Sequence, residues 1–259
     1  MANLIRTPKS GSDWTLNDLL AYNIRVVFQD SATFFGVQNL PLPQVDDSIL
    51  NVREVADAQD DDTFEFLQTM EAAMNPEPNE ESALDVFALI LFRILHYANM
   101  GSRRFSRTRK NLHFMSCGEE RIAKTDVCIM DICRIFLLVQ EDKRRLGGPN
   151  PEPQLIAQAI AAFTMNNDTR VRLFMEDPLV SSIIPGITMM GTMPTFYKIE
   201  VTRDLVYAVQ FGVYPEQETI VYAHQPKVLR TTNRYVEGMM PLDNRRITLS
   251  CYEAFKQFI

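Results

Sequence analysis

The apolar and polar positions between residues 125 and 163 predict two strands followed by a helix. Thr125–Asp131 and Ile135–Lys143 are rich in Val, Ile, Leu and Phe and are short enough for strands. A few residues around Ile132–Arg134 separate them, so we expect an antiparallel hairpin. After a Gly/Pro-rich loop, Pro151–Phe163 has an apolar stripe at helical spacing behind two prolines that suit a first helical turn.

Upstream of the hairpin, the pattern predicts helices. Thr15 is placed to cap a short helix, and a second helix begins at Thr63, behind the acidic run Asp57–Asp62, whose charges favour a helix start. Ser82–Met100 is apolar on almost every side, which indicates a buried helix. By contrast, Ser31–Pro43 reads as a turn-rich loop over the surface.

The rest of the chain predicts more strands and an α/β (α+β) fold with a mixed central sheet flanked by helices. A strand is expected directly before the hairpin, four more follow it, and an amphipathic helix ends the chain: Asn111–Cys117, Ile187–Met193, Thr195–Val201, Leu205–Phe211, Thr219–His224 and Ile247–Ile259. A Pro-rich linker at Asn75–Glu81 separates a mainly helical N-terminal extension, residues 1–79, from a core of residues 80–259. We expect the two parts to pack as one compact unit.

The predicted hairpin brings acidic side chains together. If the reversal is centred between Cys133 and Arg134, Asp126 lies opposite Glu141, and Lys143 shares the face of Glu141. Two opposed carboxylates repel each other and are costly to desolvate unless a cation or a proton lies between them. Their oxygens suit Mg²⁺ or Mn²⁺, and the lysine is placed to position a water and neutralise developing charge.

This constellation resembles the PD-(D/E)XK nuclease superfamily, whose core is a helix, a three-stranded meander, a helix and a further strand. Asp126 matches the Asp of the second strand, and Glu141-Asp142-Lys143 matches the (D/E)-x-K of the third, although Lys124 and Thr125 stand where a Pro is expected. The resemblance covers residues 80–163. It implies a restriction-endonuclease-like core, with metal held by Asp126, Glu141 and the backbone carbonyl of Asp142, and with Asp126, Glu141 and Lys143 as catalytic residues.

Other residues fit further roles in such a site. Glu119 and Glu120 are close in sequence to Asp126 and are candidate ligands, as are the acids at the start of the Ser82–Met100 helix, which capping explains more simply. Gln154 and Gln158 lie one helical turn apart, and either is placed to contact the site, but solvent exposure is the favoured expectation. An acidic-x-Lys triplet is common by chance, so the same acids also fit a solvated charge cluster at a strand end.

The overall net charge is −7, but the charges are distributed unevenly along the chain. Residues 1–100 carry −11, residues 101–150 carry +5, and residues 151–259 carry −1. An acidic chain argues against a nucleic-acid partner, but the cations gather beside the candidate site, where they suit backbone phosphates. They are Arg103, Arg104, Arg107, Arg109, Lys110, Arg144 and Arg145. The first five also fit a solvated loop or a nuclear-import signal.

Several classes of protein are disfavoured by the rest of the sequence. The four cysteines form no C-x-x-C pair and the three histidines are far apart, which makes a zinc cage improbable. We found neither an apolar run long enough for a membrane span nor a signal-peptide core, so we expect an intracellular protein, cytoplasmic or nuclear, without a membrane partner. Stretches along the whole chain, such as PEPQLIAQAIAAF and CYEAFKQFI, also resemble the sequences of a large group of proteins from mushroom-forming fungi. That resemblance implies no activity.

The leading hypothesis from sequence is a metal-dependent nuclease that hydrolyses DNA or RNA. Two alternatives stay open: an interaction protein that keeps a nuclease-like core without catalysis, and an enzyme that uses the same pocket on a small molecule. The acidic N-terminal hundred residues favour the first alternative, because they are suited to cover a basic site or to mimic nucleic acid.

Overall fold

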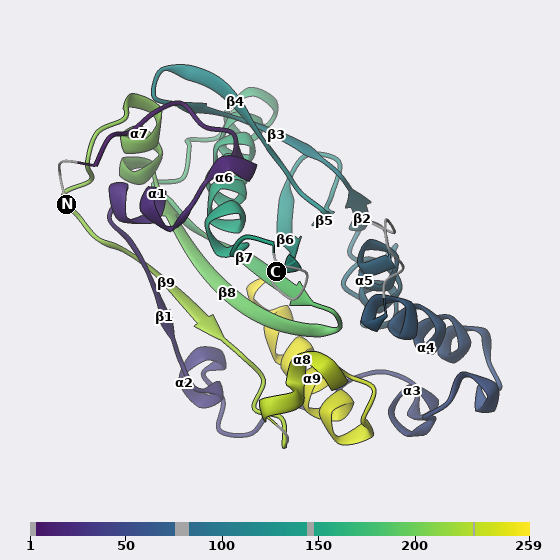
Figure 1. Ribbon diagram of the computed structural model, residues 1–259. Coiled ribbons are helices and arrows are strands. Elements are labelled where there is room, and N and C mark those ends of the chain that lie inside the picture. The colour runs from purple at the N-terminus through teal and green to yellow at the C-terminus, as the bar shows by residue number, and fades with distance from the viewer. Residues whose placement is uncertain (1–3, 76–82, 144–147, 230) are drawn as a thin grey trace.

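A mixed seven-stranded sheet with helices on both faces forms the centre of the protein (Figure 1). The computed structural model describes residues 4–75, 83–143, 148–229 and 231–259. The strand order is β1-β9-β8-β7-β6-β5-β2, and β3 and β4 form a separate two-stranded sheet. The predicted α/β class with a mixed central sheet and flanking helices is therefore confirmed.

The strands run parallel at two places in the large sheet and antiparallel elsewhere. β1 pairs parallel with β9, and β6 pairs parallel with β7. The strand bounds are β1 Ile24–Phe28, β2 Phe105–Thr108, β3 Asn111–Ser116, β4 Glu119–Lys124, β5 Val127–Met130, β6 Ile135–Glu141, β7 Ser181–Met190, β8 Met193–Thr202 and β9 Thr219–His224. Because β1 lies at one edge of the sheet, the N-terminal segment supplies a strand as well as helices.

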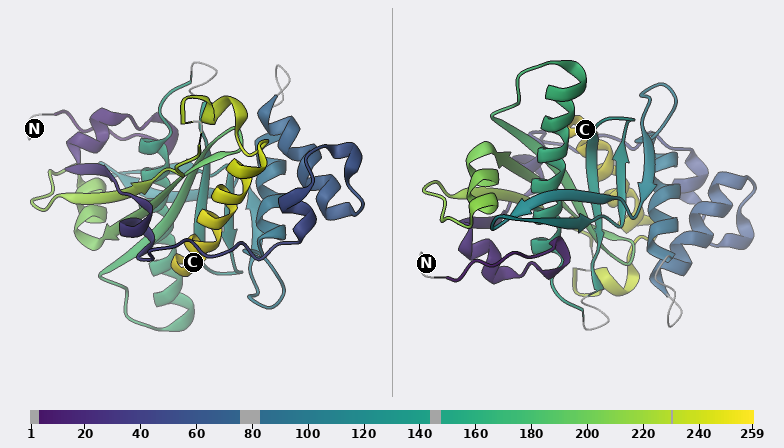
Figure 2. Two further views of the ribbon diagram at one scale, coloured as in Figure 1. Left: turned by 90° about the horizontal axis from the view of Figure 1, so that it is seen from below. Right: turned by 90° about the horizontal axis from the view of Figure 1, so that it is seen from above.

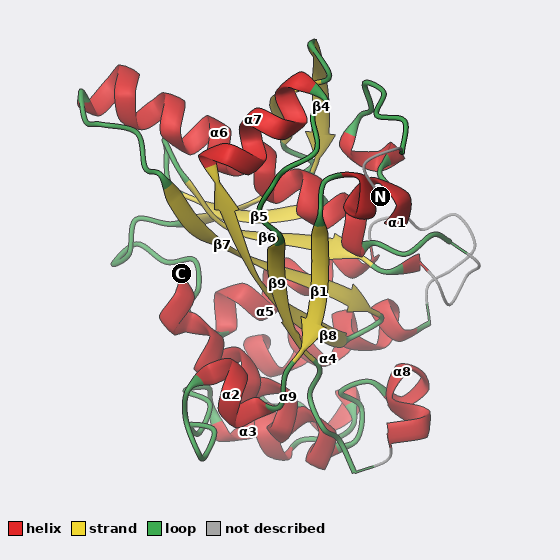
Figure 3. Cartoon of the chain, turned by 90° about the vertical axis from the view of Figure 1, so that its left-hand side faces the viewer, coloured by secondary structure: helices red, strands yellow, loops and turns green. Residues whose placement is uncertain are grey.

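Two layers of helices cover the sheet (Figure 3). One core cluster joins α1, α6, α7 and the β3–β4 hairpin to one face, and the other joins α2, α3, α4, α5 and α9 to the opposite face. The α-helix bounds are α1 Leu16–Ala21, α2 Ser31–Phe35, α3 Asp47–Asn51, α4 Asp61–Met74, α5 Ala83–Ile94, α6 Glu152–Phe174, α7 Arg203–Phe211, α8 Arg234–Glu237 and α9 Leu242–Phe255. No helix among the described residues is long and apolar enough to cross a membrane.

The strand hairpin at the centre of the sequence analysis is confirmed, and the strand expected before it forms as β3, but its expected place beside the hairpin is wrong. β5 and β6 pair antiparallel. Asn111–Cys117 was expected as their neighbour, whereas β3 pairs with β4 outside the large sheet and packs its buried Leu112 and Phe114 toward α6. The neighbour of β5 is β2, which lies inside the basic stretch for which no strand was expected. A four-residue polar strand carries no pattern that reveals its pairing.

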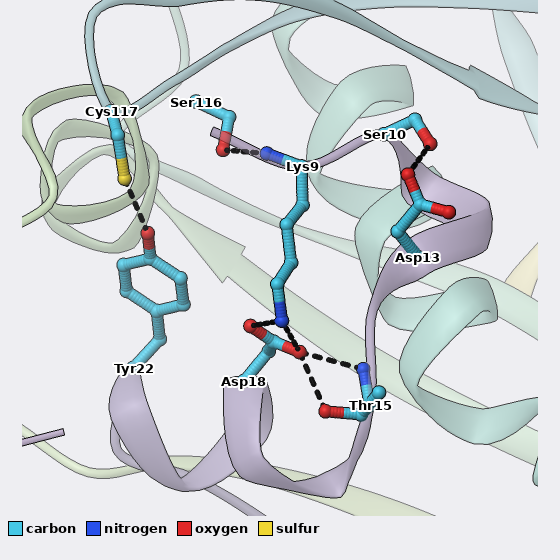
Figure 4. A network of polar contacts seen from close by, with 8 residues as sticks. All are labelled: Lys9, Ser10, Asp13, Thr15, Asp18, Tyr22, Ser116 and Cys117. Carbon is cyan, nitrogen blue, oxygen red and sulfur yellow. Dashed lines mark hydrogen bonds and ion pairs between the residues drawn. The ribbon is translucent and has the colours of Figure 1, made fainter. Parts of the chain in front are cut away.

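The N-terminal segment is fastened to the β3–β4 hairpin by polar contacts (Figure 4). The Lys9 ammonium donates to both carboxylate oxygens of Asp18, at 2.8 and 2.9 Å, and the Lys9 backbone N donates to Ser116 Oγ at 3.4 Å. The Tyr22 hydroxyl lies 3.3 Å from Cys117 Sγ. The contacts to Ser116 and Cys117 tie together segments about a hundred residues apart in sequence, while the Lys9–Asp18 ion pair fastens the segment to α1.

The views from below and above place α4 and α5 together beyond the β2 end of the sheet and show α6 lying across its other face (Figure 2). α5 also contacts β2 and β5. The beginning of β5, the end of β6 and the first turn of α5 consequently meet at one end of the sheet.

Candidate functional site

The acidic residues of the candidate site come from three elements. Asp85 lies in the first turn of α5, Asp126 directly precedes β5, and Glu141 is the last residue of β6. The Arg109 backbone N donates to Asp126 O at 2.9 Å, Arg109 Nε lies 3.9 Å from Asp85 Oδ2, and the Glu141 backbone N donates to Asp126 Oδ2 at 2.8 Å, so the three acidic residues meet at one end of the sheet. Burial raises the pKa of Asp85, and the negative charges of Asp126 and Glu141 raise it further. Lys143 and Arg109 act on the same group in the opposite direction.

The register of the hairpin differs from the predicted one by one residue. Val127 pairs with Val139 and Cys128 with Leu138, so Asp126 comes next to Gln140, and the prediction that it lies opposite Glu141 is wrong. The reason lies in the turn, where Asp131 Oδ1 accepts hydrogen bonds from two backbone N–H groups, those of Cys133 at 2.7 Å and Arg134 at 2.6 Å. A bulge at the start of β6 then adds one residue to that strand.

This register sends neighbouring side chains of β6 to different faces. Val139 packs in the cluster of α5 and Leu138 in the cluster of α6. By the alternation of side chains, Glu141 follows Val139 toward α5 and Gln140 follows Leu138 toward α6. Asp126 is outside the strand, and its carboxylate reaches the strand end, where Oδ2 accepts hydrogen bonds from Gln140 Nε2 at 2.6 Å and from the Glu141 backbone N at 2.8 Å.

Burial controls the protonation of Asp126 and Asp85. Desolvation raises the pKa of Asp126, while the Glu141 backbone N–H and the charges of Lys143 and Arg109 lower it. Desolvation also raises the pKa of Asp85 to about 6, helped by the charge of Asp126. The Arg109 Nε lies 3.9 Å from Asp85 Oδ2 and opposes this shift. Desolvation is thus the largest influence on the pKa of both carboxyl groups.

Glu141 and Lys143 form an ion pair at the open end of β6. Lys143 Nζ lies 3.4 Å from Glu141 Oε2, and 45% of the lysine side chain is exposed against 20% of the glutamate side chain. Asp142 between them is buried, and its backbone N donates to Met189 O at 2.7 Å, which continues the pairing with β7. The structure therefore brings Asp126, Glu141 and Lys143 together and adds Asp85. Arg144 and Arg145 lie outside the described residues.

The predicted phosphate-binding cations separate into two groups. Arg104 lies with its guanidinium 4.3 Å from the centre of the Phe136 ring, and Arg109 faces Asp85. Arg103 and Arg107 are exposed at the β2 edge of the sheet, and Lys110 is half-buried beside β5, where its backbone exchanges hydrogen bonds with Thr125. The cations line the edge strand that leads to the site, so they do not form a separate loop.

Glu119 and Glu120 lie at the far end of the β3–β4 hairpin. Lys124, not these acids, is the residue of β4 next to Thr125 and Asp126, and five residues of strand span roughly 17 Å. Glu119 pairs with Arg121, and Glu120 Oε1 lies 2.8 Å from His113 Nδ1. Their local partners account for both acids.

Two glutamines that the sequence left open have different places. Gln154 is half-buried at the start of α6. Gln158 was expected to face solvent, but it is completely buried, and its Nε2 donates to Gln140 Oε1 at 2.6 Å. The sequence indicates the burial of Gln158, because this residue lies three residues after Leu155 on the apolar stripe of the helix. Gln140 had no such signal.

The donor set fits a hard divalent cation in its chemistry. Within the described part of the chain, no three His, Cys, Asp or Glu side chains lie close enough together to hold a metal ion. Mg²⁺ commonly binds one or two carboxylates and keeps several waters, and Asp126 and Glu141 are the residues that would hold it. Comparison with known protein-family models and with curated proteins finds no match to this chain.

Proposed function

We propose that the protein is a divalent-metal-dependent phosphodiesterase that hydrolyses nucleic acid, with a PD-(D/E)XK-type site. The observation that carries this proposal is the meeting of Asp126 and Glu141, beside Lys143, at one end of the sheet, where Asp126 Oδ2 accepts from the Glu141 backbone N at 2.8 Å and Lys143 Nζ lies 3.4 Å from Glu141 Oε2. Carboxyl groups that repel one another in a desolvated place gain most from a bound cation.

The order of elements supports the same proposal. α5 is followed by the meander β2-β5-β6, then by α6 and by β7, and the β3–β4 hairpin is inserted between the first two strands of the meander. Asp126 stands at the second strand of this meander and Glu141-Asp142-Lys143 at the end of the third. This is the order of elements in the superfamily core and the position of its motif residues.

Each residue has a role that follows from its place. Asp126 and Glu141 would hold Mg²⁺ or Mn²⁺, and the ion would stabilise the negative charge that develops on the phosphate. Lys143, with its exposed ammonium beside Glu141, would orient the attacking water and donate a hydrogen bond to the phosphate. Arg109 would neutralise phosphate charge next to Asp85, and Arg103 and Arg107 would hold flanking phosphates along the edge strand.

The first prediction tests metal binding and cleavage together. Millimolar Mn²⁺ should raise the melting temperature of the wild type by several degrees, at about 2–4 °C per kcal/mol of binding energy. Asp126→Asn and Glu141→Gln should lose this response, whereas Glu119→Gln, a matched control at the far end of the hairpin, should keep it. Lys143→Ala should keep both the metal response and oligonucleotide binding but lose Mn²⁺-dependent cleavage. Cleavage at the wild-type rate by the Lys143 variant contradicts the proposed role.

A second candidate function is a nuclease-like interaction protein that uses no metal. It is favoured by contacts that already satisfy the acids, namely the Glu141–Lys143 ion pair and the hydrogen bonds to Asp126 Oδ2. A wild-type melting curve that ignores Mn²⁺, together with no cleavage of any single- or double-stranded substrate, would select this candidate.

A further inference from the structure

A line of polar side chains runs from the interior of α6 to the candidate site. Gln158 Nε2 donates to the Lys124 backbone O at 2.8 Å and to Gln140 Oε1 at 2.6 Å. Gln140 Nε2 in turn donates to Asp126 Oδ2 at 2.6 Å. Gln158 is completely buried and 6% of Gln140 is exposed, so water does not compete for these bonds.

The hydrogen bonds fix the orientation of both amides. Gln158 faces two acceptors, the Lys124 carbonyl and Gln140 Oε1, and only its NH₂ group can satisfy them. With its Oε1 occupied in this way, Gln140 must turn its own NH₂ group to Asp126. The orientation has a cost, because Gln158 Oε1 is buried and has no hydrogen-bond partner in the described part of the chain. A buried acceptor without a partner destabilises the folded state, since it has lost its hydrogen bonds to water.

As a result, the two carboxylate oxygens of Asp126 differ in their hydrogen bonding. Oδ2 accepts from Gln140 Nε2 and from the Glu141 backbone N, while no hydrogen bond reaches Oδ1 from any residue that the structure describes. A carboxylate whose one oxygen is held by two donors has a fixed plane and presents its other oxygen in one direction. That direction is set by Gln140, and the direction of Gln140 is set by Gln158.

We propose that Gln158 and Gln140 are positioning residues that fix the Asp126 carboxylate for cation binding. The inference rests on the proposed function of the Asp126 and Glu141 site. Leu or Met in place of Gln158 would pack in the helix without a buried unpaired acceptor. A role of Gln158 and Gln140 in positioning Asp126 explains why the protein keeps a glutamine here at a cost in stability. Hydrogen-bond partners of metal ligands typically change metal affinity by about 10–100-fold when they are replaced.

The test compares Gln158→Met with Gln154→Met, the same substitution one turn earlier on α6. We expect Gln158→Met to raise the Mn²⁺ concentration of the half-maximal melting shift by about tenfold or more, and Gln154→Met to leave it unchanged. Gln140→Met should have an effect as large. In the double variant of Gln140 and Gln158 the effects should not add, because Gln158 acts only through Gln140. The double variant also removes Gln140 Oε1, the acceptor that Gln158→Met leaves without its donor.

A second measurement tests, without metal, the chain of hydrogen bonds from Gln158 through Gln140 to Asp126, which we call the relay. The side-chain NH₂ signals of Gln140 in an amide NMR spectrum should shift and lose protection from exchange in Gln158→Met and stay unchanged in Gln154→Met. Unchanged Gln140 signals in Gln158→Met overturn the relay. A Gln158→Met protein with a lower melting temperature but the wild-type Mn²⁺ midpoint shows a purely structural role and overturns positioning. If the wild type ignores Mn²⁺, the proposed function fails, and with it the role in cation binding, while the NMR signals still decide whether the relay exists.

Discussion

The carboxyl group of Asp85 adds negative charge to the candidate site and lowers the stability of the fold. Its pKa is raised from 3.8 to about 6, with burial as the main cause and the charge of Asp126 as the next. The folded state therefore binds more protons than the unfolded state between these two values, and the free energy of unfolding falls as pH rises through that window. Above it, the charged carboxyl destabilises the fold by at most about 3 kcal/mol.

The second prediction follows from this fall of the free energy of unfolding with rising pH. Asp85→Asn should raise the free energy of unfolding at about pH 8 by roughly 1–3 kcal/mol and change it little at about pH 4, where the acid is protonated in the fold. Urea unfolding at both pH values measures the difference. Asp168→Asn, at an exposed position of α6, serves as the control. Equal effects of Asp85→Asn at the two pH values would show that the burial of its charge is not the cause.

At the scale of elements, capping explains both a confirmed helix and a wrong strand. Thr15 and Asp18 form the capping box that begins α1, as the sequence predicted. Leu205–Phe211 was predicted as a strand because it is rich in β-branched and aromatic residues, but it lies in α7. The Thr202 side chain caps this helix, and Gly212, with a left-handed φ of 66°, ends it. Leu205, Ala208 and Val209 are the buried positions, which is helical spacing.

The candidate site was predictable only in part, for a reason that lies in the elements. Asp126, Glu141 and Lys143 are brought together because strands β5 and β6 follow the hydrophobic pattern. Their register was not predictable, since it depends on the side chain of Asp131 in the turn and on a bulge, neither of which changes that pattern. The relay through Gln140 depends on the true register, and so the sequence could not reveal it.

A third prediction concerns the junction of α9 with α3. Arg245 is completely buried, and its guanidinium donates to the backbone O atoms of Ile49 at 2.9 Å, Val52 at 2.6 Å and Met239 at 3.2 Å. Burial lowers its pKa to about 10. Arg245→Met should lower the free energy of unfolding by roughly 2–4 kcal/mol, because the carbonyl groups lose their donor. Chemical denaturation measures this loss.

The adjacent Arg246 is the matched control for Arg245. It is partly exposed and donates to Asn51 Oδ1 at 2.6 Å, so Arg246→Met should cost no more than about 0.5 kcal/mol. Similar losses in the two variants would mean that the buried carbonyl contacts do not distinguish Arg245.

At the scale of the whole molecule, the sheet depends on pairings that no local pattern encodes. β1 pairs with β9 although nearly two hundred residues separate them, and β2 pairs with β5 across the β3–β4 hairpin. Length and apolar periodicity predicted the class of fold and most of the strands, but the order of strands is fixed by long-range packing. The basic stretch shows the consequence, because its part Phe105–Thr108, for which no strand was expected, pairs with β5 and forms the edge of the sheet.

The last prediction rests on this edge, where the exposed Arg103 and Arg107 lie in an otherwise acidic protein. Phosphate contacts release counterions, so binding to a labelled oligonucleotide should weaken steeply with added salt. Replacing both arginines by Ala should reduce the slope of log K against log salt by about 1.4–1.8 while leaving the Mn²⁺ melting shift intact. Arg53→Ala, which removes an exposed cation from the N-terminal segment, should leave the slope unchanged. Equal losses in the two proteins would indicate that net charge alone governs binding, and an unchanged slope in the double variant would place the nucleic acid on another surface.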